Sequence, residues 1–245
     1  SRVQPRTQTG IAVSAGDGSW TLINASPDLP SQIRATPALH PRGELRGSPV
    51  DAVVLTGAEI DQIAGLLSLR ESSPFTLYAT PASHAAVAAN AMFGAMGAMS
   101  RRAINPGERF MLAGDIEATL FMVPGKLPLY LEGEAPELDT ESAANVGIEL
   151  HREGARMVFV PGTAAVTPAM RERFARADVV LFDGTLFTDD EMIRTRTGQK
   201  TGRRMGHLQI DGDGGSLRAL AGLSARRIFV HINNTNPILI EGSVE

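Results

Sequence analysis

The sequence of 245 residues contains no cysteine, which excludes disulfide bonds and any thiolate metal site in this chain. It also lacks an apolar run long enough to cross a membrane and an opening signal peptide, so we expect a cytoplasmic protein without membrane insertion. No long polar linker divides it, and we expect one α/β domain over residues 1–245. A formal charge of −4 and a pI near 5.8 argue against nucleic-acid binding.

One stretch carries polar side chains where a strand passes into a helix. Val53–Thr56 is short, apolar and β-branched, as in a buried strand, and the apolar residues of Ile60–Leu67 fall on one helical face. Between and beside them are Glu59, Asp61 and Gln62. A carboxylate-bearing turn of this kind can place ligands at the edge of a sheet. Aspartate is also a favoured helix cap, so the pattern alone leaves a cap and a ligand site open.

The rest of the chain alternates between short strands and helices. Strands are predicted at Thr9–Ser14, Trp20–Asn24, Phe75–Ala79, Phe110–Leu112, Ile116–Val123, Val146–Leu150, Met157–Val160, Val179–Phe182 and Arg227–Ile232. Helices are predicted at Pro81–Phe93 and Pro168–Arg176. Leu129–Ala143 is acidic and irregular, and we expect a loop there.

Several phrases spread over most of the chain match one family. They are Asn24-Ala-Ser-Pro-Asp28, Gly65-Leu-Leu-Ser-Leu-Arg-Glu71, Asp183-Gly-Thr185, Asp189-Asp-Glu-Met192, Lys200-Thr-Gly-Arg203, Met205-Gly-His207 and His231-Ile-Asn-Asn-Thr-Asn-Pro-Ile-Leu239. Through them the chain resembles the PqqB family (pyrroloquinoline quinone biosynthesis protein B) of the metallo-β-lactamase superfamily. The resemblance implies a four-layer αββα sandwich with mixed sheets. Such chains usually begin with a glycine-rich strand and a cysteine-rich segment, so we expect a strand to be missing at each end.

The histidines that hold two zinc ions in the superfamily are largely replaced here. Where the superfamily carries Thr-His-x-His-x-Asp-His, this chain has Gly57, Glu59 and Gln62 at the histidine positions. Lys126 stands where a further histidine is usual, and Gly162 where an aspartate bridges the metals. A protonated lysine is a poor ligand. Hydrolysis of lactams, thioesters or phosphodiesters is therefore a poor fit.

The metal ligands that remain are Glu59, Asp61, Gln62 and His231, an oxygen-rich set that suits a hard or borderline divalent ion. The resemblance implies Fe(II), with Zn or Mn as substitutes, and O2-dependent hydroxylation of the tyrosine ring in a Glu-Tyr precursor derived from the PqqA peptide. The family usually has histidine where Gln62 stands. Because an amide oxygen is a weaker ligand than imidazole, we predict looser iron binding.

Further site residues are expected at the ends of other strands. Asp183 and His207 are the candidate catalytic residues, with Asp183 orienting a histidine, although an ordinary turn aspartate explains its position equally well. The candidate substrate-binding residues are Lys126, Arg203, Asn233, Asn234 and Asn236. A solvated lysine is an equal alternative for Lys126.

The expected partners are a small-molecule or peptide substrate derived from Glu-Tyr, other proteins of pyrroloquinoline quinone (PQQ) biosynthesis, and a second copy of the chain in a homodimer. An alternative function is a non-catalytic carrier that binds PQQ or its precursor for transport to the periplasm. A metal-free scaffold in a biosynthetic assembly is a third. A ligand-poor site is compatible with all three.

Overall fold

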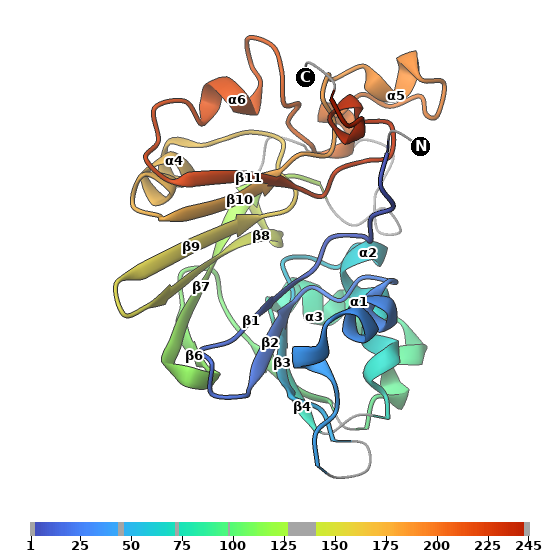
Figure 1. The fold of residues 1–245 in the computed structure, drawn as a ribbon, viewed down its shortest axis with the longest axis vertical. Coiled ribbons are helices and arrows are strands. Elements are labelled where there is room, and N and C mark those ends of the chain that lie inside the picture. The colour runs from blue at the N-terminus through green and yellow to red at the C-terminus, as the bar shows by residue number, and fades with distance from the viewer. Residues whose placement is uncertain (1–2, 44–46, 72–73, 98, 127–140, 243–245) are drawn as a thin grey trace.

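The computed structural model describes residues 3–43, 47–71, 74–97, 99–126 and 141–242. The first sheet contains, in spatial order, β1 (Ile11–Val13), β2 (Trp20–Ile23), β3 (Val50–Val54), β4 (Phe75–Ala79) and β5 (Met99–Ala103). Only β1 and β2 pair antiparallel in it, and the other neighbours are parallel. Helices α1 (Leu29–Ala35) and α3 (Pro81–Ala88) lie on its outer side (Figure 1).

The second sheet is formed by the later part of the chain. Its strands, in spatial order, are β11 (Arg226–Val230), β10 (Val179–Asp183), β9 (Ala155–Val160), β8 (Glu141–Arg152), β7 (Ile116–Pro124) and β6 (Arg109–Leu112). Strands β6 to β9 form an antiparallel meander, whereas β9, β10 and β11 run parallel. Both sheets are therefore mixed, as predicted.

The remaining elements are short. They are the α-helices α2 (Ile60–Ile63), α4 (Pro168–Ala175), α5 (Glu191–Arg194) and α6 (Ser216–Ala219), and the 3-10 turns η1 (Pro37–Leu39), η2 (Ala64–Leu69), η3 (Ala91–Ala95), η4 (Ala113–Asp115), η6 (Arg203–Met205) and η7 (Pro237–Leu239). Within the described ranges, no helix has the length and apolar character needed to cross a membrane.

Three hydrophobic clusters show how the layers are held together. Successive residues of a strand face opposite sides of its sheet, so Val53 packs with Leu66 and Val87 of the helical layer, whereas Val54 faces the second sheet. On the outer side of the second sheet, a third cluster joins α4 to β9 and β10; its largest side chains include Phe174 and Phe182. The order of layers is helix, sheet, sheet, helix, which confirms the predicted four-layer αββα sandwich.

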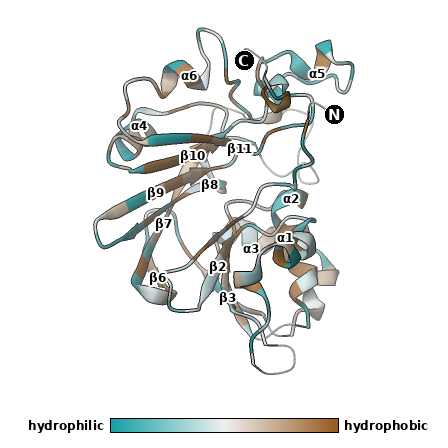
Figure 2. Cartoon of the chain, in the orientation of Figure 1, coloured by the Kyte–Doolittle hydropathy of each residue, from teal (hydrophilic) through white to brown (hydrophobic). Residues whose placement is uncertain are grey.

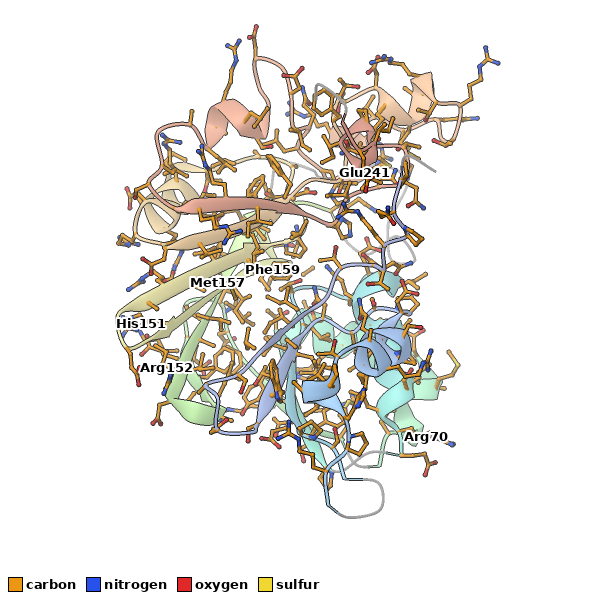
Figure 3. The ribbon with its side chains drawn as sticks, in the orientation of Figure 1. Arg70, His151, Arg152, Met157, Phe159 and Glu241 are labelled. Atoms are coloured by element: carbon orange, nitrogen blue, oxygen red, sulfur yellow. The ribbon has the colours of Figure 1, made fainter. Side chains whose placement is uncertain are left out.

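The figures show the same arrangement. Hydrophobic colour runs along the strands where the sheets meet, and hydrophilic colour marks the outer ends of β9 and β11 (Figure 2). Figure 3 shows Phe159 where the second sheet faces the first, and Phe159 is fully buried in the cluster between the sheets. Apolar residues from both sheets thus form the central core.

The structure departs from the sequence prediction in several segments, and the strand predicted at Val53–Thr56 is found at Val50–Val54. The predicted helix at Pro81–Phe93 ends at Ala88 and is followed by the separate turn η3. Strand β5 was not predicted, because its polar and exposed residues have no alternating pattern and its pairing with β4 defines it. The loop expected at Leu129–Ala143 falls outside the described residues up to 140, and from Glu141 onward the chain is in β8.

Candidate metal and substrate site

The segments that follow β3, β7, β9, β10 and β11 surround one cavity of about 590 Å³. The carboxyl ends of parallel strands meet at one edge of a sheet, so segments far apart in sequence converge there. The cavity is lined by Glu59, Asp61, Gln62, Lys126, Asn145, Pro161, Gly162, Thr185, Gly198, Gln199, Lys200, Met205, Gly206, His207, His231 and Asn233.

Buried hydrogen bonds fix the turn between β3 and α2. The backbone N–H of Thr56 donates to Oδ1 of Asn24 at 2.9 Å, and the Asn24 amide donates to the Thr56 hydroxyl at 2.8 Å. The backbone of Asn24 has φ of 63°, a left-handed conformation that asparagine tolerates better than most residues. At Gly65, an added Cβ would lie 2.1 Å from the carbonyl oxygen of Ser26. Glycine is therefore required where η2, which follows α2, packs against the segment after β2.

Gln62 caps the helix that carries the candidate ligands. Glu59 is the N-cap residue of α2, and its backbone N–H donates to Oε1 of Gln62 at 3.1 Å in a capping box. At Gly57, an added Cβ would lie 2.5 Å from the same amide oxygen. The Gln62 amide thus occupies space left by the missing side chain of Gly57. The oxygen predicted to bind metal is used to cap the helix, and the N-cap is Glu59 rather than Asp61.

His231, which follows β11 of the second sheet, contacts Asp61 of α2, which follows β3 of the first sheet. Nε2 of His231 lies 2.7 Å from Oδ2 of Asp61, and Nδ1 of His231 lies 2.7 Å from the hydroxyl of Thr185. The backbone of His231 has φ of 57°, and its N–H donates to the hydroxyl of Thr9 at 2.8 Å. A histidine held in this uncommon conformation at a strand's end is typical of functional sites.

Asp183 orients His207 from beneath the cavity. Asp183 is fully buried, and its Oδ2 lies 2.8 Å from Nδ1 of His207. The same oxygen accepts the N–H of Thr163 at 3.1 Å, and Oδ1 accepts both the N–H and the hydroxyl of Thr185 at 3.0 and 2.6 Å. With Nδ1 of His207 directed at a carboxylate, its Nε2 is the ring nitrogen left for chemistry in the cavity.

Two places in this site could hold a metal ion. Candidate ligand atoms of Asp183, His207 and His231 all lie within 4.8 Å of one another. The hydroxyl of Thr185, however, contacts all three residues, and Asp183 already accepts four hydrogen bonds. The hydroxyl therefore occupies the centre of that group.

The better place is between Asp61 and Nε2 of His231. The hydroxyl of Thr185 donates its hydrogen bond to Asp183, so it accepts a hydrogen bond from the Nδ1–H of His231. In a neutral imidazole Nε2 then carries a lone pair, and it faces the carboxylate of Asp61. Two electron-pair donors at this distance need a proton or a cation between them. This donor set fits a divalent metal.

The pKa values of this pair follow from the same contacts. Burial lowers the pKa of His231, but its hydrogen bond to Asp61 and the charges of Asp61 and Asp183 raise it more, so the net pKa is above 6.5. Burial raises the pKa of Asp61, yet the contact with His231 brings its net pKa below 3.8. In the metal-free protein their contact therefore favours the protonated form of His231 and the ionised form of Asp61.

The cavity includes most, but not all, of the residues predicted from the sequence. Glu59, Asp61, Gln62, Lys126, His207, His231 and Asn233 line it, and Asp183 lies beneath His207. Nζ of Lys126 lies 3.5 Å from Oε1 of Glu59. Arg203 and Asn234 are exposed and are not among the lining residues. Asn236 is buried, and its amide donates to the carbonyl oxygen of Gly184 at 2.9 Å.

Some residues of the site were missed by sequence reasoning. Thr185 contacts both histidines, and Lys200 and Asn145 line the cavity. Thr185 stands in the phrase Asp183-Gly-Thr185, and Lys200 in a basic stretch, so both positions carried a weak signal. Nothing in the sequence around Asn145 marks it, because only the pairing of β7 with β8 brings it beside the cavity.

Comparisons with known proteins agree on one family. Residues 19–232 match the model of the β-lactamase superfamily domain. "Coenzyme PQQ synthesis protein B" of Methylorubrum extorquens is 50% identical over 248 residues, which span 100% of this chain and 83% of the relative; that of Rhizobium meliloti is 50% identical over 99% of this chain and 81% of the relative. The crystal structure of Zn(2+)-bound PqqB from Methylobacterium extorquens superposes with a TM-score of 0.96 at 50% identity, covering 99% of this chain and 82% of that chain.

Proposed function

The chain belongs to the coenzyme PQQ synthesis protein B family of the β-lactamase superfamily, and from this membership we propose that it acts in PQQ biosynthesis as an oxygenase. Its reaction is the Fe(II)- and O2-dependent hydroxylation of the tyrosine ring in a Glu-Tyr precursor. The observation that carries the proposal is the contact of Asp61 with Nε2 of His231 at the wall of a cavity, beside a histidine oriented by a buried carboxylate.

Glu59, Asp61 and His231 are the proposed metal ligands. Two carboxylates and one imidazole form an oxygen-rich donor set that suits a hard or borderline divalent ion such as Fe(II), which would supply open positions for the activation of oxygen. The relative whose crystal structure superposes on this chain is described as zinc-bound. Oxygen and imidazole ligands accept both metals, so zinc is expected to compete with iron at these residues. Gln62 is excluded from the proposed set, because its amide oxygen caps α2.

His207 is the proposed proton acceptor for the phenol. Its Nδ1 is held 2.8 Å from Asp183, which fixes the ring and leaves Nε2 to face a substrate. Burial raises the pKa of Asp183, but its charge interactions with the two histidines and its hydrogen bonds with His207 and Thr185 together bring the net pKa of Asp183 below 3.8. The ionised Asp183 then stabilises the imidazolium that forms when His207 takes a proton.

Lys126 and Lys200 are the proposed partners of the substrate carboxylates. Both line the cavity together with the amide of Asn233. The side chain of Lys126 is only 13% exposed, so a carboxylate that reaches it is shielded from water and interacts more strongly than at the surface. A Glu-Tyr substrate carries carboxylates at a distance from its ring, which allows the ring to lie beside His207 and His231.

Anaerobic titration with Fe(II), followed by reaction with a Glu-Tyr peptide under air, tests the proposal. Near-stoichiometric binding and a product heavier by one oxygen atom are expected. Asp61→Ala abolishes both, while the matched control Asp51→Ala, an exposed aspartate of β3, leaves both unchanged. Site-dependent iron binding without hydroxylation, or hydroxylation that survives in Asp61→Ala, contradicts the oxygenase proposal.

A carrier of PQQ or its precursor is the second candidate. It is favoured by the replacement of most zinc-binding histidines and by two lysines in the wall of the cavity. A carrier binds the tricarboxylic quinone tightly without metal, and Lys126→Gln weakens that binding. Saturable quinone binding in chelator-treated protein, with no turnover after Fe(II) is restored, selects the carrier.

A further inference from the structure

A second cavity lies on the outward face of the second sheet, away from the first. It has a volume of about 450 Å³ and is lined by residues of β6, β7, β8, β9 and α4. None of these residues lines the first cavity. Strand β8 contributes Asn145 to the first cavity and His151 to the second. These two residues are six positions apart on an extended strand, which corresponds to a distance of about 20 Å. Figure 3 shows His151 at the outer end of the β8–β9 hairpin.

The pairing of the strands makes the floor of this cavity polar. Arg109 lies opposite Thr119, which lies opposite Glu149. In the next row, Glu117 lies opposite His151, which pairs with Arg156. Helix α4 contributes Arg173 to the lining of the cavity, and the C-cap residue that follows the helix contributes Arg176.

Positive charge predominates in the lining. Four arginines face two glutamates, which leaves a surplus of two positive charges with His151 counted as neutral. The chain as a whole carries a formal charge of −4, so this cavity opposes the overall charge of the protein. A local surplus of cationic side chains in a concave site attracts anions.

Two of the arginines are held in place from below. Glu149 is 7% exposed, and its two carboxylate oxygens accept hydrogen bonds from Nη1 of Arg156 and Nη1 of Arg173, the latter at 2.6 Å. The guanidinium of Arg173 also lies over the ring of Phe121, 4.7 Å from its centroid. Guanidinium groups oriented by a buried carboxylate and an aromatic ring lose little entropy when they bind a ligand.

These arginines retain donors for a ligand. A guanidinium has five N–H groups, and among the described residues only Glu149 accepts hydrogen bonds from the side chains of Arg156 and Arg173. In the same part of the chain, no hydrogen bond or ion pair engages the side chain of Arg176. The remaining pair, Arg109 with Glu117 at 3.6 Å, is largely exposed and weak.

We propose that this cavity is a second binding site, which takes a small molecule bearing two or more phosphate or carboxylate groups. Guanidinium groups recognise both anions through paired N–H donors. The volume lies in the range of small-molecule sites, and exceeds what one inorganic phosphate fills. The site is independent of the proposed oxygenase reaction, because it shares no residue with the first cavity.

Calorimetric titration of the full chain at low ionic strength tests the site, with pyrophosphate, citrate and inorganic phosphate as probes. Saturable binding of pyrophosphate or citrate at one site is expected, with inorganic phosphate weaker. Arg176→Gln weakens this binding about tenfold, as for the loss of one charge-assisted contact. Arg176 is exposed and follows the last residue of α4, so the variant keeps the fold, which thermal unfolding verifies.

Arg101→Gln is the matched control, because it removes the same charge from an exposed arginine of β5 outside the cavity. It leaves the affinity unchanged. Tighter binding of citrate assigns the site to carboxylates, and tighter binding of pyrophosphate assigns it to phosphates. Equal weakening by both variants overturns the proposal, as does the absence of saturable binding. Binding of a polyglutamate peptide without either small anion also overturns it, in favour of an acidic protein partner.

Discussion

The hydroxyl of Thr185 lies 2.7 Å from Nδ1 of His231, although 46 residues separate the two in the sequence. The same hydroxyl donates to the buried Asp183 at 2.6 Å and lies 3.1 Å from Nδ1 of His207. One side chain thus connects the candidate metal ligand with the candidate proton acceptor. It also determines which nitrogen of His231 faces Asp61, since the other nitrogen is engaged.

Replacing this hydroxyl is expected to weaken metal binding without removing a ligand. Thr185→Val lowers Fe(II) affinity about ten- to hundredfold, the usual effect of losing a hydrogen bond behind a ligand histidine. Thr185→Ser keeps the hydroxyl and restores most of the affinity. Competition with a chromophoric chelator measures both constants. An unchanged affinity in Thr185→Val contradicts the role given to Thr185.

Gln62→His is expected to tighten Fe(II) binding, because imidazole is the stronger ligand. The same change removes the side chain that caps α2, which costs about 1 kcal/mol of unfolding free energy. Gln62→Ala is the control, because it loses the cap without adding a ligand. Urea unfolding of the metal-free proteins and anaerobic titration separate the effects. If Gln62→His binds iron no more tightly than the parent, the account of this substitution is wrong.

Gly65→Ala is expected to destabilise the protein by about 2–3 kcal/mol, because the new Cβ would lie 2.1 Å from the carbonyl oxygen of Ser26 and the backbone must move. Gly94→Ala is the matched control, since nothing lies within 4 Å of a Cβ there. Chemical denaturation compares the two variants. Equal stability would show that the turn relaxes without cost.

The ion pair of Asp61 and His231 makes the stability of metal-free protein depend on pH. The pKa of His231 is raised in the folded state. Its contribution to the unfolding free energy is therefore complete below about pH 6.5 and is lost as pH rises through the higher pKa of the folded state. The pKa of Asp61 is lowered in the folded state. Its contribution to the unfolding free energy is therefore present above about pH 3.8 and is lost as pH falls through the lower pKa of the folded state.

The destabilisation caused by Asp61→Asn should therefore be largest between about pH 4 and pH 6.5, and smaller at pH 9. Unfolding free energies of chelator-treated protein across this range provide the measurement. The exposed Asp51→Asn is the control and shows no such profile. A destabilisation that does not change with pH would mean that the pair is not ionised.

Asn236 and Asn234 were both predicted to bind substrate, and the structure assigns them different environments. Asn236→Ala removes a buried hydrogen bond to Gly184 and a helix cap, so it lowers the unfolding free energy by about 1–2 kcal/mol. Asn234→Ala, at an exposed position, leaves stability unchanged. A substrate KM that rises in Asn236→Ala without loss of stability would support its predicted role in substrate binding.

The sequence by itself determined the family, and through that resemblance the layers of the fold. The apolar run Val53–Thr56 also predicted a buried strand, because such a run is local and can be recognised without a structure. The phrases around Asp61, Asp183, His207 and His231 were equally local, and these residues do converge on one cavity or lie directly beneath it.

Only the tertiary structure decided what each polar side chain contacts. Gln62 can cap a helix or bind metal, and in the structure its amide oxygen caps α2 in the space beside Gly57. Thr185 became central only when β10 and β11 paired and the segment carrying His207 folded over them. Asn236 was buried by the chain that follows β11, and Arg203 was left at the surface. Hydrogen-bond partners depend on neighbours distant in sequence, and residue type does not encode those distances.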